Sequence, residues 1–227
     1  MRLFVLAAML CMAARVPVSA AEPHLASPLE RFSYGVGLQI GQSLTSQGIN
    51  KLDPAALALA IQDMLNGQPP RLTMEQLREA QTSYRKALLD ERKAVSDKNL
   101  ADGESFLAAN AKRDGIVSLE SGVQYRVLKE GEGTSPNIDD TVKVHYRGTL
   151  LDGREFDSSL QRGEPLTIPL NGVISGWQQV VSRMKPGGTV ETWIPAKHAY
   201  GERGSPPAIG PNSTLYFHIQ LLGIESE

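Results

Sequence analysis

The sequence is nearly devoid of cysteine. Its 227 residues include only Cys11, which lies in an apolar run near the N-terminus. A single thiol cannot close an intramolecular disulfide or build a cysteine-rich zinc site. The 4 histidines are not paired at the spacing of metal ligands. The composition therefore predicts no metal centre and no disulfide framework, and we expect no cofactor.

The chain also lacks an excess of charge of either sign. Its 23 Lys and Arg residues are interspersed with 25 Asp and Glu residues, which gives a net charge of −2. This balance argues against a nucleic-acid-binding surface and against a patch for anionic membranes. No glycine-rich phosphate loop follows a predicted strand, and no G-x-S-x-G nucleophile motif is present. Hydrophobic residues make up 41% of the chain, which is enough for one or two globular domains.

The longest apolar run is short. It covers residues 3–14, follows a positively charged second residue, and leads to the small residues Ser19-Ala20-Ala21. This pattern is too short to span a bilayer and is typical of a secretory signal. We therefore expect residues 1–20 to be a signal peptide. A buried N-terminal helix is one alternative; a lipid anchor on Cys11 is another, although the bulky Leu10 precedes it.

Two short amphipathic helices are predicted within residues 21–72. The first begins at the capping sequence Ser27-Pro28-Leu29-Glu30, and the second extends from Asp53-Pro54 to Asn66-Gly67. The glycines at 35, 37 and 41 either mark a weak helix or permit close helix–helix packing. Because two helices of this size are marginal alone, we expect residues 21–72 to form a homodimerisation domain.

A third helical pattern extends from Thr73 to about Lys112, with Gly103 as an interruption. A helix of roughly 40 residues would be about 60 Å long. Its surface is mostly charged and polar, with a thin apolar stripe that becomes sparse after Val95. Such a helix cannot be buried on all sides, so residues 73–114 are predicted to be a long connecting helix. A coiled coil with a partner helix is the alternative.

The pattern changes from a helical period to alternation after Asp114-Gly115. Apolar and β-branched residues follow it in VQYRVL, TVKVHYRGTL, PLTIPL, TVETWI and TLYFHIQLL, with turn signals between the segments. One short helix fits between about Gly176 and Met184. Residues 115–227 are therefore predicted to form an antiparallel sheet wrapped around one short helix, which makes the whole chain α+β.

The predicted strands argue against a serine hydrolase. In the strand that contains Val144 and Tyr146, alternation directs His145 to the opposite face, and His218 is directed away from the apolar face in the same way. If the apolar faces form the core, both histidines face solvent. We therefore do not expect nucleophilic catalysis.

Three segments resemble the signature sequences of the FK506-binding-protein family of peptidyl-prolyl isomerases. They are VKVHYRGTLLDGREFDSS, VISGWQQVVSRMKPGG and HAYGERGSPPAIGPNSTLYFHIQLL, in the family's order and spacing. The resemblance covers roughly residues 122–224. Residues 32–113 also resemble the N-terminal domain of the bacterial macrophage infectivity potentiator class, whose members are secreted and often dimeric.

The resemblance implies a peptidyl-prolyl cis-trans isomerase with a half-barrel sheet. It implies export to the periplasm or outer-membrane surface of a Gram-negative bacterium, where the protein would assist the folding of exported proteins. Proline-containing unfolded or partly folded polypeptides would be its substrates, and macrolides its inhibitors. The alternative is a proline-peptide-binding chaperone module whose catalytic pocket is vestigial, but the retained Phe156, Asp157, Trp177 and Tyr200 argue against a vestigial site.

The resemblance also implies an apolar pocket with Trp177 as its floor and with the Ile174 N–H and Tyr200 hydroxyl as donors. Asp157 is expected to orient Tyr146, or else to be a purely structural loop carboxylate. The implied catalytic residues are Tyr146, Phe156, Asp157, Trp177, Tyr200 and Phe217, and the implied substrate-binding residues are Leu166, Val173, Ile174, Ser205, Ala208 and Ile209.

Three of these positions depart from the family pattern. Leu166 replaces a common aromatic residue, Ser205 a frequent histidine, and Ala208 a larger aliphatic residue. These changes would open the rim of the pocket, so they bear on ligand affinity, including that for macrolides, more than on activity.

Overall fold

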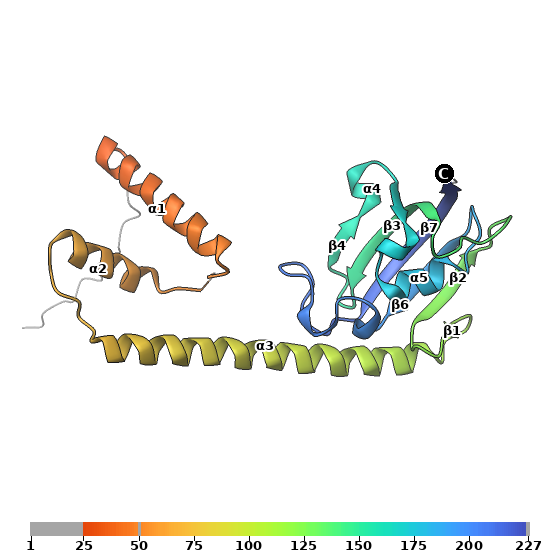
Figure 1. The fold of residues 1–227 in the computed structure, drawn as a ribbon, viewed down its shortest axis with the longest axis horizontal. Helices are drawn as coiled ribbons and strands as arrows, with labels where there is room; N and C mark the ends of the chain where they lie inside the picture. The colour runs from red at the N-terminus through yellow and green to blue at the C-terminus, as the bar shows by residue number, and fades with distance from the viewer. Residues whose placement is uncertain (1–24, 50, 226–227) are drawn as a thin grey trace, which may run out of the picture. The chain divides into compact units, whose positions relative to one another are not determined.

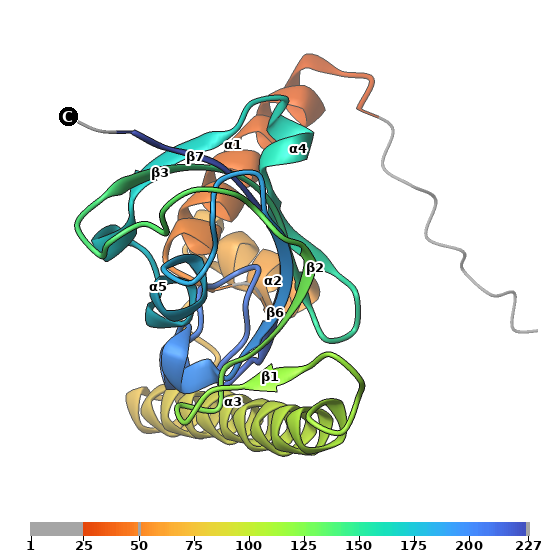
Figure 2. The ribbon, with the colours of Figure 1, turned by 90° about the vertical axis from the view of Figure 1, so that its right-hand side faces the viewer.

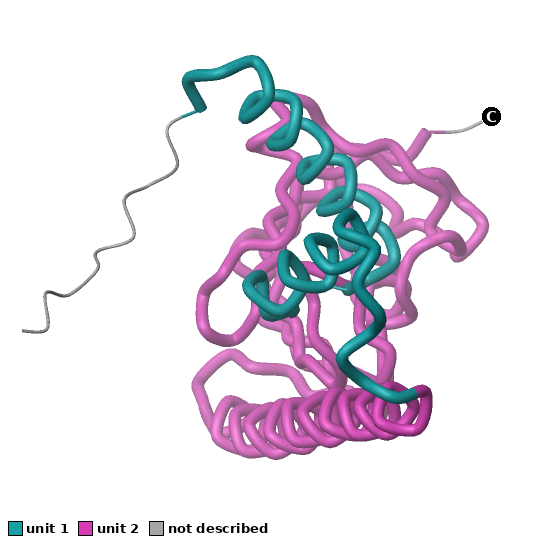
Figure 3. Tube along the Cα trace, turned by 90° about the vertical axis from the view of Figure 1, so that its left-hand side faces the viewer, with its two compact units in different colours: residues 1–73 teal, residues 74–227 magenta. Residues whose placement is uncertain are grey.

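The computed structural model describes residues 25–49 and 51–225 and divides into two compact units, Met1–Thr73 and Met74–Glu227 (Figures 1 and 3). The predicted signal peptide and Cys11 lie outside the described residues. The first unit holds helices α1 (Pro28–Ser46) and α2 (Pro54–Leu65), and the second holds α3 (Met74–Asn110) and the sheet. Among the described residues, no helix is both long and apolar enough to cross a membrane.

Both helices of the first unit begin at the predicted capping residues. The Ser27 hydroxyl accepts from the Glu30 N–H, and the Glu30 carboxylate accepts from the Ser27 N–H at 2.7 Å. Asp53 caps α2 by accepting from two backbone N–H groups, and α2 ends before Gly67, whose φ is +65°. No residue of α1 or α2 is buried within the described part of the chain, so both apolar faces are left without a core.

The second unit contains one antiparallel sheet that curls around helix α5 (Ser175–Val181) (Figure 2). The strand order is β1-β2-β6-β7-β3-β4, and β5 also pairs with β3. The strands are β1 (Val117–Ser118), β2 (Gln124–Lys129), β3 (Thr141–Leu150), β4 (Glu155–Ser158), β5 (Leu166–Pro169), β6 (Thr189–Ile194) and β7 (Leu215–Glu225). Short helices α4 (Ser159–Arg162), η1 (Leu170–Gly172), η2 (Ala196–His198) and η3 (Gly201–Arg203) lie in the connections. The predicted α+β class is confirmed.

The core lies between the concave face of the sheet and α5. On β3, Val142 and Val144 are fully buried, and Tyr146 is 6% exposed. On β7, Phe217 and its alternating neighbours are buried in the same cluster, as is Val180 of α5. Successive strand residues point to opposite faces, so the alternation in the sequence correctly identified the buried side.

Helix α3 is continuous over 37 residues, about 55 Å, so the expected interruption at Gly103 is wrong. A Cβ atom at Gly103 would lie 2.3 Å from the Thr214 hydroxyl oxygen. The glycine therefore lets α3 approach the start of β7, although it disfavours the helix by about 1 kcal/mol relative to alanine.

The C-terminal third of α3 packs against the sheet. The Phe106 and Trp193 ring centroids are 6.4 Å apart. The buried Asn110 amide donates to Gln124 at 2.9 Å, and the Gln124 amide donates to the Leu107 carbonyl at 2.9 Å. After Val95, α3 thus contacts the sheet through one aromatic ring, Phe106, together with the small Gly103 and the polar Asn110, which explains why its apolar stripe is sparse there.

Candidate active site

Four aromatic rings from four elements meet at the head of α5. Tyr146 of β3 lies 5.1 Å from Trp177 of α5, Trp177 lies 5.3 Å from Phe217 of β7, and Phe217 lies 5.5 Å from Phe156 of β4. Interplanar angles of 84–86° make all three pairs edge-to-face, which suits the quadrupoles of the rings. We call these four residues the ring cluster.

The ring cluster depends on a glycine that the sequence did not single out. A Cβ atom at Gly148 of β3 would lie 2.7 Å from the Phe156 ring and 2.8 Å from the Phe217 ring. Gly148 pairs with Asp157 on β4 and with Phe217 on β7. The missing side chain is therefore what allows the two phenyl rings to meet over β3.

The predicted substrate-binding residues differ in how far they are buried against the ring cluster. Ile209 is 4% exposed and belongs to the same buried cluster as Trp177, and Leu166, Val173 and Ile174 are partly buried against it. Ser205 and Ala208 are exposed, in the turn in which the backbones of Ser205 and Ile209 pair through two 2.9 Å hydrogen bonds.

Asp157 is engaged through both carboxylate oxygens. The Tyr146 hydroxyl donates to one oxygen and the Arg162 guanidinium to the other. Arg162 also donates to the Tyr146 hydroxyl at 2.9 Å and lies 5.5 Å from the centre of its ring. Arg162 was not among the predicted site residues; its only signal in the sequence is an arginine five residues after Asp157, before the glycine that ends α4.

The ring cluster and its surroundings hold three hydrogen-bond donors without a partner among the described residues: the Trp177 indole N–H, the Ile174 N–H and the Tyr200 hydroxyl. The Ile174 carbonyl accepts from the N–H groups of Trp177 and Gln178, but no bond engages the Ile174 N–H. The Tyr200 hydroxyl is likewise unbonded, and Tyr200 is 41% exposed. A backbone N–H and a phenol are thus available to carbonyl groups of a bound chain.

The pKa values of Tyr146 and Tyr200 are both raised, so both phenols keep their proton. Burial, and then the negative charge of Asp157, raise the pKa of Tyr200. Burial and the hydrogen bond to Asp157 raise the pKa of Tyr146, although Arg162 acts in the opposite direction. Because phenols ordinarily lose their proton near pH 10, both remain neutral throughout the physiological range.

His145 and His218 lie on the face of the sheet opposite the core, as the alternation predicted. His145 is only partly exposed, and its Nδ1 lies 3.1 Å from the hydroxyl of Ser159; His198 Nδ1 lies 3.0 Å from the Ser175 hydroxyl. Ser159 is fully buried, and its hydroxyl accepts from the Tyr146 N–H and donates to the Tyr146 carbonyl. It is therefore a structural tether between β3 and α4, without access to a substrate.

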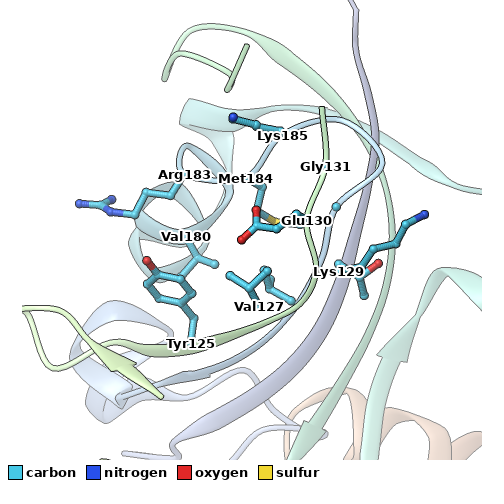
Figure 4. A pocket seen from close by; sticks show the side chains of 12 residues that line it. Tyr125, Val127, Lys129, Glu130, Gly131, Val180, Arg183, Met184 and Lys185 are labelled. Atoms are coloured by element: carbon cyan, nitrogen blue, oxygen red, sulfur yellow. The ribbon is translucent and has the colours of Figure 1, made fainter. Parts of the chain in front are cut away.

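Two hollows lie beside the sheet near the ring cluster and near the other end of α5. One of about 330 Å³ is bordered by Phe156, Asp157 and Arg162. Another, on the far side of α5 beside Tyr125 and Val180, holds only about 20 Å³, room for about one water molecule (Figure 4). Among the described residues, no group of three or more His, Cys, Asp or Glu side chains is placed to hold a metal ion.

Comparison with known proteins identifies the family. Residues 132–222 match the family described as FKBP-type peptidyl-prolyl cis-trans isomerase. Residues 29–127 match the domain amino terminal to FKBP-type peptidyl-prolyl isomerase. The chain is 43% identical over 192 residues to the FKBP-type 22 kDa peptidyl-prolyl cis-trans isomerase of Escherichia coli K12, covering 85% of this chain and 93% of that one. The chain belongs to the FKBP-type peptidyl-prolyl cis-trans isomerases.

Further matches place this FKBP-type enzyme beside the macrophage infectivity potentiators, as its sequence predicted. It is 39% identical over 205 residues to outer membrane protein MIP of Legionella longbeachae, with 88% of each chain covered. The crystal structure of FkpA from Escherichia coli superposes with a TM-score of 0.65 at 33% identity, covering 88% of this chain and 98% of that one. The enzyme is a peptidyl-prolyl cis-trans isomerase of class EC 5.2.1.8, with the N-terminal helical domain that accompanies this family.

Proposed function

We propose that the ring cluster is the substrate site of this isomerase, with the proline ring of an X–Pro segment against Trp177. The observation that carries the proposal is the unbonded Ile174 N–H, whose residue packs against the rings, together with the unbonded Tyr200 hydroxyl, which lies near enough to Asp157 for the carboxylate to raise the pKa of Tyr200. Val173, Leu166 and Ile209 would flank the proline, and the exposed Ser205 and Ala208 would leave the rim open to neighbouring substrate residues.

The reaction needs no proton transfer. The X–Pro amide twists against a resonance barrier of about 18–20 kcal/mol, and unaided isomerisation takes tens to hundreds of seconds. An acceleration of about 10⁴-fold requires roughly 5–6 kcal/mol of selective stabilisation of the twisted state. The twisted amide is less dipolar than the planar one, so an apolar site penalises it less, while two donors hold the flanking carbonyls.

In this proposal Asp157 is an orienting group. Its carboxylate and the Arg162 guanidinium together fix the Tyr146 hydroxyl, whose ring packs on Trp177. Because both carboxylate oxygens already accept hydrogen bonds, the geometry favours a role in shaping the ring cluster over a role as general base.

Tyr200→Phe tests the proposed donor. We expect kcat/KM on a short X–Pro peptide to fall about tenfold, because one hydrogen bond made in the transition state is lost. The fold should not change, since the hydroxyl makes no bond to the described residues. The control is Tyr34→Phe in α1, which also removes one exposed tyrosine hydroxyl. An unchanged rate for Tyr200→Phe would show that Tyr200 does not belong to the substrate site.

The activity of the wild-type enzyme should stay flat from about pH 6 to 8, since no essential group titrates like histidine there.

We further propose that the enzyme assists the folding of exported proteins as a homodimer. The two helices of the first unit expose apolar side chains, among them Phe32 at 71% and Leu65 at 83%. Pairing with a second copy would bury this surface and hold two catalytic domains on one dimeric base. The rival function, a binding module with a vestigial site, is disfavoured because the rings, the carboxylate and both donors are all present.

Export rests on the sequence of the first twenty residues and is tested by mass spectrometry of the protein from its native cell. We expect an N-terminus near Ala21, because cleavage follows the small residues Ser19-Ala20. The mature protein should be recovered outside the inner membrane, in the periplasm or at the outer-membrane surface. An intact Met1, or a lipid on Cys11, would contradict the proposal.

A further inference from the structure

The connection between β6 and β7 carries two of the proposed substrate contacts. It spans residues 195–214 and includes Tyr200, with its free hydroxyl, and the buried Ile209. Its regular structure is limited to the short helices η2 and η3. Figure 2 shows this connection lying over α3. Ile209 packs in the core with Phe217, and His198 contacts Ser175 of α5, but residues 210–213 are not part of the core cluster.

Side chains of α3 hold the second half of this connection. The Asn99 amide donates to the Pro211 carbonyl at 2.8 Å and approaches the Ser213 hydroxyl at 3.4 Å. The Asn212 amide donates to the Ser96 hydroxyl at 2.9 Å. A third attachment comes from Arg92, whose guanidinium reaches the backbone carbonyls of residues 202 and 203 at 3.4 and 3.2 Å.

These attachments are linked to Tyr200 through the backbone. The N–H of Asn212 donates to the Gly201 carbonyl at 2.9 Å, and the N–H of Gly204 donates to the Tyr200 carbonyl at 3.1 Å. Asn212 has a φ of +52°, a conformation that few residues other than glycine adopt, and its amide and backbone bonds hold it there. Anchoring residues 211–212 on α3 thereby fixes the backbone that carries the Tyr200 ring.

Hollows flank this line of contact. One of about 570 Å³ lies between α3 and the connection, bordered by Leu100, Gly201 and Asn212. A second, of about 260 Å³, is bordered by Asn99, Gly210 and Ser213. At its end the connection meets α3 directly, where Thr214 lies against Gly103. Between the hollows, at residues 211–212, its position depends on hydrogen bonds, which Asn99 donates to the Pro211 carbonyl and Ser96 accepts from the Asn212 amide.

We infer that Asn99 of the long helix α3 is a positioning residue for the isomerase reaction, which acts by anchoring residues 211–212 and so placing Tyr200. The inference rests on the proposed substrate site. It gives α3 a part in catalysis on short substrates, in addition to its part in linking the two units of the chain.

The test uses the full-length chain with Asn99→Asp, which keeps the size of the side chain but cannot donate to the Pro211 carbonyl. We expect kcat/KM on a short X–Pro peptide to fall about fivefold, the effect of one lost hydrogen bond. Gln81→Glu, the same amide-to-carboxylate change at an exposed position of α3, is the matched control and should leave kcat/KM unchanged. In Asn99→Asp, amide hydrogen exchange should become faster at residues 201–212 while β3 and β7 keep their protection.

A double-mutant cycle with Tyr200→Phe separates positioning from a merely structural role. If Asn99 acts through Tyr200, Asn99→Asp should have little further effect once the hydroxyl is absent, so the two losses should not add. Additive losses, an unchanged kcat/KM for Asn99→Asp, or faster exchange throughout β3 and β7 would each overturn the inference. If Tyr200→Phe alone has no effect, the proposed substrate site itself fails. If Tyr200→Phe is impaired and Asn99→Asp is not, only the positioning role fails.

Discussion

Replacing Phe156 with alanine is expected to lower kcat/KM on a short X–Pro peptide by about 30-fold, because about 2 kcal/mol of apolar contact with the bound proline is lost. Phe156 is only partly buried, and its ring packs edge-to-face on Phe217 at the open side of the ring cluster. Trp177→Leu should reduce activity further, by about 100-fold, since it removes the proposed floor. The Trp177 indole N–H makes no hydrogen bond to the described residues, so its replacement by leucine leaves no hydrogen-bond acceptor unsatisfied.

Histidine variants provide the control for this prediction. His145→Asn, His198→Asn and His218→Asn each keep a polar atom near the position of Nδ1 but remove the imidazole, the side-chain type most often used for general acid–base catalysis. The contacts of His145 with Ser159 and of His198 with Ser175 can then persist. We expect the triple variant to retain activity within a few-fold of wild type, with a flat profile from about pH 6 to 8. A bell-shaped wild-type profile that one of these substitutions abolishes would establish proton transfer and overturn the proposed mechanism.

Local features of the sequence predicted much of the fold, because they act through neighbouring residues. The capping bonds of Ser27 and Asp53 involve residues at most three positions away, and the structure shows them as expected. The alternation in β3 and β7 is a consequence of the pleat, so it identified Val144, Tyr146 and Phe217 as core residues. The strands that were missed are β1, which has only 2 residues, and β4, in which Phe156 is the only apolar residue, so neither carries a periodic signal.

The features that escaped prediction depend on contacts between distant segments. Glycine ordinarily disfavours both strands and helices, yet Gly148 in β3 and Gly103 in α3 each make room for side chains of another element. Arg162 looks like an ordinary surface residue until α4 brings it to Asp157 and Tyr146. The contact of Asn99 with Pro211 spans 112 positions of the chain, and no local pattern encodes it.

The mature chain is expected to be a homodimer in solution, held together by the first unit. Leu29, Phe32 and Leu38 of α1 are 73, 71 and 57% exposed, and Met64 and Leu65 of α2 are 73 and 83% exposed. An apolar surface of this extent on helices without a core indicates an association site. Gly37 and Gly41 are four residues apart and so share one face of α1, and neither has an atom of the described residues within 4 Å of the position of a Cβ, so that face is open to close approach by a partner helix.

Phe32→Glu is the variant that tests the dimer. On a free monomer this exposed substitution would change stability by no more than about 0.5 kcal/mol, whereas burying an unpaired carboxylate in an interface is strongly unfavourable. Light scattering at micromolar concentration should give twice the chain mass for wild type and the mass of one chain for Phe32→Glu. Gln81→Glu adds the same charge at an exposed position of α3, outside the first unit, and should remain dimeric. A wild-type monomer, or a Phe32→Glu dimer as stable as wild type, would contradict this assignment.

Removing the first unit should leave isomerase activity on short peptides intact but reduce activity in the refolding of whole proteins. A fragment that begins at Met74 retains α3 and the contacts of Phe106, Asn110 and Asn99 with the sheet and the β6–β7 connection. A cut at Gly115 would instead uncover Trp193 and leave the buried Gln124 amide without its partners, so Met74 is the better boundary. We expect the Met74 fragment to be a monomer with near-wild-type kcat/KM on short peptides.

The same fragment should lose most of its advantage in refolding a whole protein limited by proline isomerisation. A dimer presents two sites to one client chain, so release from one site leaves the client held at the other, at a high effective concentration. The short peptide is too small to gain from this, which is why the two assays should diverge. Phe32→Glu should behave like the fragment in both assays if dimerisation is the cause, because it retains every residue of the first unit but one. Equal refolding rates for the fragment, Phe32→Glu and wild type would show that the first unit contributes nothing to client capture.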